Sequence, residues 1–326
     1  MIRPKPTTPS VLQEPAAPRR GRQNTGMQRS FVLMTLPALA LLLVFAYLPM
    51  IGTVIAFKDF RAINGVFGSA WVGLRNFAFL FSSGDVLRAT FNTLFLNSLF
   101  IITGTLTALG LALLLNELKG RGRFAQWLTG VYRSTLFFPF FISWVIVGYF
   151  TFALLNGETG LINRTLQALH LQPISWYASP QYWPALLVVV NLWKNVGYGT
   201  VIYLSGMLTI DTQYYEAAEI DGATKWQQIR FVTVPFIAPI ITITVLLNIG
   251  RIFFADFGLF YNVTRDSSLL YPTTDVIDTY VFRALRQLGD FGMAGAAGLY
   301  QSVVGMVLVV LCNWIVRRRD PASSLF

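Results

Sequence analysis

One lysine lies in the middle of a long apolar stretch, where a charge is costly. Lys194 falls within residues 182–207, and its nearest polar neighbours are Asn191, Asn195 and Tyr198. Because residues three or four apart share one face of a helix, Asn191, Lys194 and Tyr198 predict a polar stripe. Such a stripe can offer hydrogen bonds to the hydroxyl groups of a polar solute and an ammonium group to a carboxylate. The alternative is a structural lysine, paired with an acid or bonded to carbonyl groups between helices.

Three further polar side chains complete this candidate substrate path. Asn248 and Arg251 lie toward the outer end of the apolar residues 235–257, and Gln301 lies within the last apolar stretch. Arg251 could contact an anionic ligand at an outer mouth. It could equally pair with Asp256 or extend its head group to the membrane interface. The sequence leaves these alternatives open.

Other kinds of chemistry lack the residues they need. The chain has one histidine, His170, and one cysteine, Cys312, so its composition predicts neither a metal site nor an internal disulfide. A Gly-x-x-x-x-Gly-Lys-Ser/Thr phosphate loop is missing from the sequence, so the chain is not expected to be an ATPase. We therefore predict no catalytic residue, no metal, no cofactor and no enzyme activity.

The composition indicates that lipid surrounds these residues. Hydrophobic residues make up 54% of the chain and charged residues 12%, whereas soluble domains carry about 25% charged residues. A helix needs about 20 apolar residues to cross a bilayer. We predict an all-α polytopic membrane protein in which six stretches cross, namely 31–57, 91–116, 132–155, 182–207, 235–257 and 291–316.

The formal net charge of +10 comes from basic residues beside the apolar stretches. This placement favours membrane orientation over nucleic-acid binding, because Lys and Arg accumulate in cytoplasmic connections. We predict a cytoplasmic N-terminal tail over 1–30, a six-span domain over 31–316 and a short basic C-terminal tail over 317–326. Both termini are expected on the cytoplasmic side of a multi-pass membrane protein.

The connection between the fourth and fifth predicted spans is unusual for a short basic loop. Its residues predict a helix, a break and a second amphipathic helix that lie against the membrane. Gly222 can adopt the left-handed conformation that ends many helices, and Pro235 is expected in the first turn of the fifth span. The segment reads Tyr215-Glu216-Ala217-Ala218-Glu219-Ile220-Asp221-Gly222-Ala223-Thr224-Lys225-Trp226.

This segment resembles the loop signature of inner-membrane permeases of binding-protein-dependent ABC importers. The matching positions are Glu216, Ala217, Ala218, Asp221, Gly222, Ala223 and Pro235. The resemblance implies a cytoplasmic coupling helix that docks into a cleft on an ATPase. It also implies a bacterial inner membrane and, as partners, a second homologous permease, an ATPase dimer and a periplasmic or lipid-anchored solute-binding protein.

Residues 71–77, which read Trp-Val-Gly-Leu-Arg-Asn-Phe, resemble the external loop of the sugar-importing branch of these permeases, and Asn92-Thr93 resembles its second-span entry. Three further segments resemble the sub-branch that imports larger saccharides, alginate-type fragments included. They are 191–200 around Lys194, 274–280, which reads Thr-Asp-Val-Ile-Asp-Thr-Tyr, and the ending Ser324-Leu325-Phe326. The resemblance implies an oligosaccharide substrate, and Lys194 and Arg251 favour an acidic one. A neutral oligosaccharide is the alternative.

Two other classes of membrane protein compete with this interpretation. An ion-coupled secondary transporter would need acids inside its spans, and Asp256 near one end is the available candidate. A membrane-embedded enzyme would need clustered acids with a base, and Asp275 and Asp278 lack such a base nearby.

Overall fold

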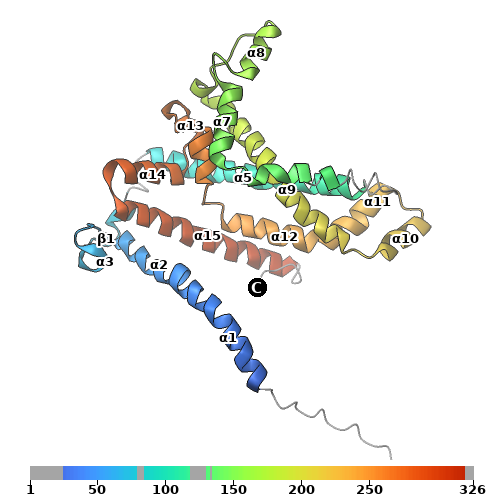
Figure 1. Cartoon of the computed structure of the whole chain (residues 1–326), viewed down its shortest axis with the longest axis horizontal. Helices are drawn as coiled ribbons and strands as arrows, with labels where there is room; N and C mark the ends of the chain where they lie inside the picture. The colour runs from blue at the N-terminus through green and yellow to red at the C-terminus, as the bar shows by residue number, and fades with distance from the viewer. Residues whose placement is uncertain (1–24, 79–83, 118–129, 133, 320–326) are drawn as a thin grey trace, which may run out of the picture. The chain divides into compact units, whose positions relative to one another are not determined.

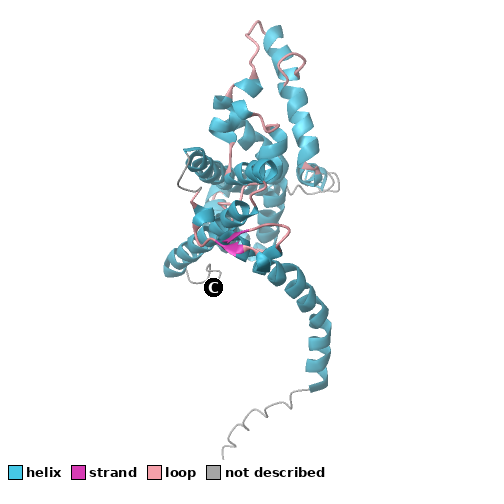
Figure 2. Ribbon diagram, turned by 90° about the vertical axis from the view of Figure 1, so that its left-hand side faces the viewer, coloured by secondary structure: helices cyan, strands magenta, loops and turns pink. Residues whose placement is uncertain are grey.

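The computed structural model describes residues 25–78, 84–117, 130–132 and 134–319. Helices make up nearly all of this part of the chain, with one short strand pair (Figure 2). Five of the described helices are long and apolar enough to cross a membrane, and six if one bent pair counts as a single span. The predicted all-α polytopic fold is thus confirmed.

The N-terminal unit, up to residue 51, is one helical segment. Helix α1 (Thr25–Leu42) continues through the π-helical turn η1 (Leu43–Tyr47) into α2 (Leu48–Met50). Its described side chains are exposed, which suits a surface that faces lipid. The helix begins inside the predicted tail 1–30, and residues 1–24 of that tail lie outside the described part.

The second unit, from residue 52 onward, contains four long helices that run in similar directions (Figure 1). Buried small and branched residues let α5 pack along α9, while α12 packs along α15. The connection that follows α5 lies mostly outside the described residues, so the basic residues Lys119, Arg121, Arg123 and Arg133 do too. The four helices are α5 (Gly84–Glu117), α9 (Trp183–Leu208), α12 (Val234–Gly250) and α15 (Phe291–Arg319).

The third predicted span is not the single straight helix that residues 132–155 suggested. A helical segment 130–141 ends in the 3-10 turn η4 (Phe138–Phe141), and α7 (Trp144–Leu155) leaves it at 98°. The backbone is extended at Ile142 and Ser143, and the Ser143 hydroxyl accepts the Ile146 N–H at 3.5 Å. The break therefore leaves carbonyl groups without helical partners inside an apolar segment.

The fifth predicted span is shifted relative to residues 235–257. It starts at α11 (Lys225–Gln228), passes through the π-helical turn η7 (Ile229–Thr233) and ends with α12 at Gly250. Pro235 lies in the first turn of α12, as expected, but α12 continues a helical segment that starts earlier, with the widened turn η7 just before it. Such a turn accommodates a residue that has no N–H to donate. Arg251 and Asp256 lie beyond the helix end.

Short elements form the connections between the long helices. They gather largely at one end of this unit, which we call the hairpin end (residues 58–78 and 251–290). The opposite end, the turn end, is α10 (Thr212–Ile220) with α11. At the hairpin end, β1 (Lys58–Asp59) pairs antiparallel with β2 (Ala70–Trp71), and η2 (Ile51–Phe57) precedes β1. The other short elements at this end are α3 (Gly65–Gly68), η3 (Arg75–Phe77), η8 (Leu259–Val263), η9 (Ser268–Leu270), α13 (Tyr271–Thr274) and α14 (Ile277–Leu288).

A separate short helix, α8 (Leu161–Ala168), follows α7. Buried Asn163 fixes the connection after it. Its amide donates to the carbonyls of Gly157 (3.0 Å) and Ile174 (2.9 Å), and its oxygen accepts from the Ile174 N–H (3.1 Å) and the Trp176 indole (3.0 Å). The turns η5 (Trp176–Ala178) and η6 (Pro180–Tyr182) then lead into α9.

Candidate functional site

The turn end has the helix–turn–helix geometry that its sequence predicts. Asp211 begins α10 by accepting the Gln213 N–H at 3.0 Å. At the other end, Gly222 has a φ of +77°, the left-handed conformation expected from the sequence. Its N–H donates to the Glu219 carbonyl (3.1 Å), and the Ala223 N–H donates to the Ala218 carbonyl (2.8 Å). These two bonds form a Schellman motif.

Local bonds close the turn and start α11. Thr224 and Gln227 form a capping box, in which the Gln227 side chain accepts the Thr224 N–H at 2.7 Å. Lys225 reaches back across the turn to Glu219, with 2.8 Å between Nζ and Oε1. The hydrogen bond from Lys225 lowers the pKa of Glu219.

The turn end exposes both apolar and acidic residues. Ile220 is 87% exposed and Trp226 is 68% exposed. Glu216, Ala217, Asp221 and Gly222 are exposed as well, while Ala218 and Ala223 are half-buried. Exposed apolar side chains rimmed by polar ones are typical of protein docking sites.

One side-chain bond ties α10 to the start of the fifth span. The Tyr215 hydroxyl lies 2.9 Å from that of Thr233 in η7. Pro235 follows two residues later, is itself exposed and stands apart from the turn along the helix. The seven residues predicted for the coupling loop therefore comprise six at the turn and one on the helix that continues from it.

Lys194 lies at the break in the third predicted span, and its side chain is bonded to that break. Lys194 is 7% exposed. Its ammonium donates to the carbonyls of Pro139 (3.4 Å), Phe140 (2.8 Å) and Ile142 (2.5 Å). An ammonium has three protons to donate, so these three bonds occupy it fully. Of the two alternatives drawn from the sequence, this geometry favours the structural lysine.

The rest of the predicted polar stripe remains accessible beside Lys194. Asn195 donates to the Asn191 side chain at 2.8 Å, on the same side of α9. Tyr198 is 48% exposed and stacks on Phe140, with ring centroids 4.9 Å apart and an interplanar angle of 11°. Amide groups and exposed aromatic faces can contact a sugar without any charge, so these three residues stay candidates for the substrate path.

The other three residues predicted for the substrate path lie outside the helix of Lys194 and differ in burial. Gln301 is buried and donates to the Phe253 carbonyl (2.6 Å) and to Asp278 (3.1 Å), so it joins α15 to the hairpin end. Asn248 and Arg251 are exposed at and just beyond the end of α12. Asp256 accepts the Trp144 indole N–H at 2.6 Å, and among the described residues it forms no ion pair with Arg251.

A family model for the inner membrane component of binding-protein-dependent transport systems matches residues 101–321. The chain belongs to this family. The protein is thus a membrane component of a transport system, which confirms the resemblance at this level.

Relatives and solved structures of this transport component agree with the assignment. LplB of Bacillus subtilis strain 168 is 34% identical over 88% of both chains. The polygalacturonan/rhamnogalacturonan transport system permease protein YteP of the same strain is 34% identical over 89% of this chain and 88% of its own. A chain in the crystal structure of a bacterial ABC transporter involved in the import of the acidic polysaccharide alginate is 32% identical, with a TM-score of 0.80 over 91% of this chain and 98% of its own.

The sequence did not reveal the ion-pair network at the hairpin end of this transport component. Arg283 bonds to Asp275 (2.6 Å) and to Asp266 (3.2 Å), and its guanidinium lies 4.0 Å from the centre of the Tyr271 ring. Burial raises the pKa of Tyr271 to about 12 and also raises that of Asp278. The acidic residues Asp275 and Asp278 are visible in the segment 274–280, but their spacing in the sequence does not show which basic residue pairs with them.

Two hydrogen bonds connect this network to α5. Asn92 of α5 donates to the Asp275 carbonyl at 3.0 Å, and the Ile277 N–H donates to the Thr93 hydroxyl at 3.0 Å. Among the residues that the structure describes, no three His, Cys, Asp or Glu side chains gather as metal ligands. The ion pair of Asp275 with Arg283 and the bonds from Asn92 and to Thr93 fix the connection between α12 and α15 in place.

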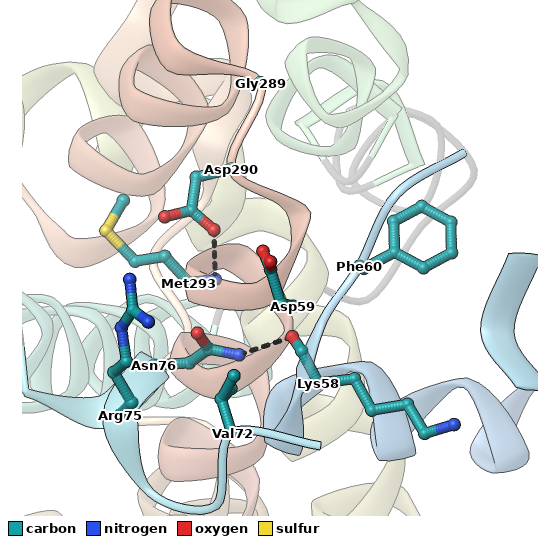
Figure 3. Close-up of a pocket in the computed structure, with 9 residues that line it drawn as sticks. All are labelled: Lys58, Asp59, Phe60, Val72, Arg75, Asn76, Gly289, Asp290 and Met293. Atoms are coloured by element: carbon teal, nitrogen blue, oxygen red, sulfur yellow. Dashed lines mark hydrogen bonds between the residues drawn. The ribbon is translucent and has the colours of Figure 1, made fainter. Parts of the chain in front are cut away.

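The hairpin end also contains a polar cavity of about 380 Å³ between η3, β1 and the start of α15 (Figure 3). Its walls are fixed by hydrogen bonds within the chain. Asn76 donates to the Lys58 carbonyl at 2.8 Å, and Asp290 accepts the Met293 N–H at 2.8 Å. The Lys58 ammonium bonds instead to the carbonyls of Val66 (2.7 Å) and Phe67 (3.2 Å). The polar groups Lys58, Asn76 and Asp290 at this cavity are thus already bonded within the chain.

Proposed function

We propose that this chain is a permease subunit of an ATP-driven importer for acidic oligosaccharides. The observation that carries the proposal is its match, over 98% of that chain, to a subunit of a transporter involved in alginate import. A second structure of a bacterial alginate ABC transporter, bound to a periplasmic protein that holds an alginate pentasaccharide, matches with a TM-score of 0.79 and 31% identity. The 34% identity to the polygalacturonan/rhamnogalacturonan permease protein supports an acidic substrate as well.

The proposed assembly contains a second homologous permease, a cytoplasmic ATPase dimer and a periplasmic or lipid-anchored solute-binding protein. ATP hydrolysis then occurs on the separate ATPase subunits. The turn end faces the cytoplasm in this proposal, together with both termini. Its exposed Ile220 and Trp226 support the docking of a protein there.

The geometry of the turn end suggests how motion reaches the membrane. Residues 209–211 join α9 to α10, and α11 continues through η7 into α12 as one helical segment. The Tyr215–Thr233 bond couples α10 to that second helix. A displacement of the docked turn is therefore transmitted to two membrane helices at once, as alternating access requires.

The charge of the substrate rests on the relatives and no longer on Lys194. The trehalose/maltose transport system permease protein MalF of Thermococcus litoralis is 28% identical over 88% of this chain, so a neutral oligosaccharide remains the second candidate. The occupied ammonium of Lys194 is the structural observation that favours it. Asn191, Asn195 and Tyr198 suit either substrate, as do the exposed Asn248 and Arg251 at the end of α12.

The assembly is tested by substituting the left-handed glycine of the turn. We expect Gly222→Val to insert normally but to reduce ATP-driven uptake and retention of the ATPase more than tenfold, because the strained turn can no longer present α10 and α11 together. Gly73→Val is the matched control, since Gly73 has a φ of +59° and, like Gly222, open space around an added Cβ.

Both variants are measured in proteoliposomes that contain the complete transporter and its binding protein, with acidic and neutral oligosaccharides in parallel. Normal uptake and ATPase retention by Gly222→Val would rule out the coupling role of the turn. Uptake of neutral sugars alone by the unaltered transporter would replace the acidic substrate with the neutral one.

A further inference from the structure

A second cavity, of about 220 Å³, lies between α7 and η8. Its walls come from Val145, Gly148 and Tyr149 on one side and from Tyr261, Asn262, Arg265 and Asp266 on the other. The two elements are in direct backbone contact, because a Cβ added to Gly148 would lie 2.6 Å from the Asn262 carbonyl oxygen. The shape of the cavity is therefore set by a tight packing contact.

The backbone at the rim of this cavity adopts an unfavourable conformation. Arg265 and Asp266 have φ angles of 57° and 48°. Non-glycine residues occupy this left-handed region rarely, and such strain concentrates at ligand sites. The turn places the Asp266 carboxylate on Arg283 (3.2 Å) and Tyr271 (3.1 Å), while the Arg265 guanidinium lies 4.1 Å from the centre of the Phe152 ring.

Arg265 and Arg283 differ in how their charge is balanced. Arg283 is held by Asp275 and Asp266. Asp266 is thus already engaged, and within the part of the chain that the structure describes Arg265 makes no ion pair and no side-chain hydrogen bond. Phe152 orients the guanidinium from one side and leaves its N–H groups free. A planar guanidinium of this kind binds a carboxylate through two parallel hydrogen bonds.

The other walls suit a small ring that carries hydroxyl groups. Tyr149 is largely exposed and offers a ring face and a hydroxyl. Tyr261 is half-buried: one face of its ring stacks on Phe257 at 4.9 Å, and its hydroxyl accepts a hydrogen bond from Arg286 at 3.4 Å. It therefore forms a fixed wall of the cavity. The volume is below the roughly 300–1,000 Å³ of pockets for drug-sized ligands. A single sugar residue of a longer chain fits this size better than a whole oligosaccharide.

We propose that the cavity between α7 and η8 binds one carboxylated sugar residue, with Arg265 on the carboxylate and the Tyr149 and Tyr261 side chains beside the ring. This inference rests on the proposed import of acidic saccharides, and it assigns to the carboxylate a site that Lys194 does not provide. Arg265 then acts as a specificity-determining residue, because a neutral sugar residue gains nothing from its charge.

Binding is measured with the purified protein in lipid nanodiscs. The probes are a trisaccharide of uronic acid residues and its carboxyl-reduced, neutral counterpart. We expect Arg265→Gln to weaken binding of the acidic trisaccharide at least tenfold and to leave the neutral one unchanged. Arg265→Lys should recover part of the affinity, because it keeps the charge but loses the two-point geometry. Arg164→Gln, at an exposed arginine on α8, is the matched control and should bind both probes normally.

A second variant tests the ring contact separately. Tyr149→Ala should weaken both trisaccharides, because it removes a wall that does not depend on charge. Unchanged binding of the acidic probe by Arg265→Gln would overturn the inference, and so would equal weakening of both probes by that variant.

Uptake by the complete transporter separates this inference from the proposed function. If the unaltered transporter imports the acidic trisaccharide and Arg265→Gln imports it equally well, the site assignment is wrong and the function stands. If the unaltered transporter imports neutral sugars alone, the acidic function and the site are both wrong.

Discussion

The hairpin end and the turn end are built in opposite ways. At the hairpin end, buried polar groups join residues far apart in the chain, as when Asn92 donates to the Asp275 carbonyl and Gln301 to Asp278. At the turn end, nearly all bonds are local, such as the 2.8 Å contact between Lys225 and Glu219. The apolar side chains there point to solvent.

This difference separates stability from partner binding. A buried ionic network costs stability when it loses one member, because a charge is left without a partner. A side chain in an exposed turn held by local hydrogen bonds can be substituted with little effect on the stability of the remaining structure. We therefore expect substitutions at the hairpin end to act on folding and those at the turn end to act on assembly and transport.

The largest effect on stability is expected from Arg283→Met. It leaves the Asp275 carboxylate, 2% exposed, without its partner, and breaking such a pair costs about 3–5 kcal/mol. Thermal unfolding in detergent should show a clearly lower transition. Arg286→Met, at an exposed position on the same helix, is the control and should unfold like the unaltered protein. Equal transitions for both variants would mean that the network does not hold this end together.

An intermediate effect is expected from Lys194→Met, which extends the comparison to the break between η4 and α7. The substitution keeps the apolar stem but leaves the carbonyls of Phe140 and Ile142 without their donor. Unsatisfied buried acceptors cost about 1–3 kcal/mol, so the unfolding transition should fall. Uptake of acidic and neutral sugars should fall together. Unaltered melting, with slower uptake of the acidic sugar alone, would instead place Lys194 in the substrate path.

The smallest effect on stability is expected from Lys225→Ala at the turn end. Its ion pair with Glu219 is exposed on both sides, and such pairs contribute little to folding. The unfolding transition should remain where it is, while uptake falls modestly because the turn is less firmly closed. Glu219→Gln is the companion variant and should behave alike. A transition lowered as far as that of Arg283→Met would erase the distinction between the two ends.

Much of the fold could be predicted because apolar length and turn residues are local signals. Helices α5, α9 and α15 lie where the apolar stretches predicted them, and Gly222 has the expected left-handed backbone. The end of α12 was placed too late, since apolar residues such as Ile252 and Phe253 continue beyond Gly250. Residues buried by packing and residues buried by lipid have the same apolar character.

The long-range contacts could not be predicted from one sequence. The position of Lys194 is obvious, but its acceptors lie more than fifty residues earlier in the chain. The break at Ile142 and Ser143 lies in an apolar stretch whose composition also suits a straight helix. Arg265 and Asp266 have a left-handed backbone, and neither is a glycine, the residue that usually indicates this conformation in a sequence. Tertiary contacts decide all three, and the roles assigned to the coupling loop and the substrate path remain predictions.

The bonds of Lys194 have a consequence for how the chain is made. Synthesis proceeds from the N-terminus, so residues 139–142 leave the ribosome before residue 194. The carbonyl groups that receive the ammonium have therefore already been synthesised when residue 194 emerges. A charge at the bilayer centre costs at least about 2.5 kcal/mol when it has no such partner. The order of segments along the gene thus supplies the acceptor first and the charged helix second.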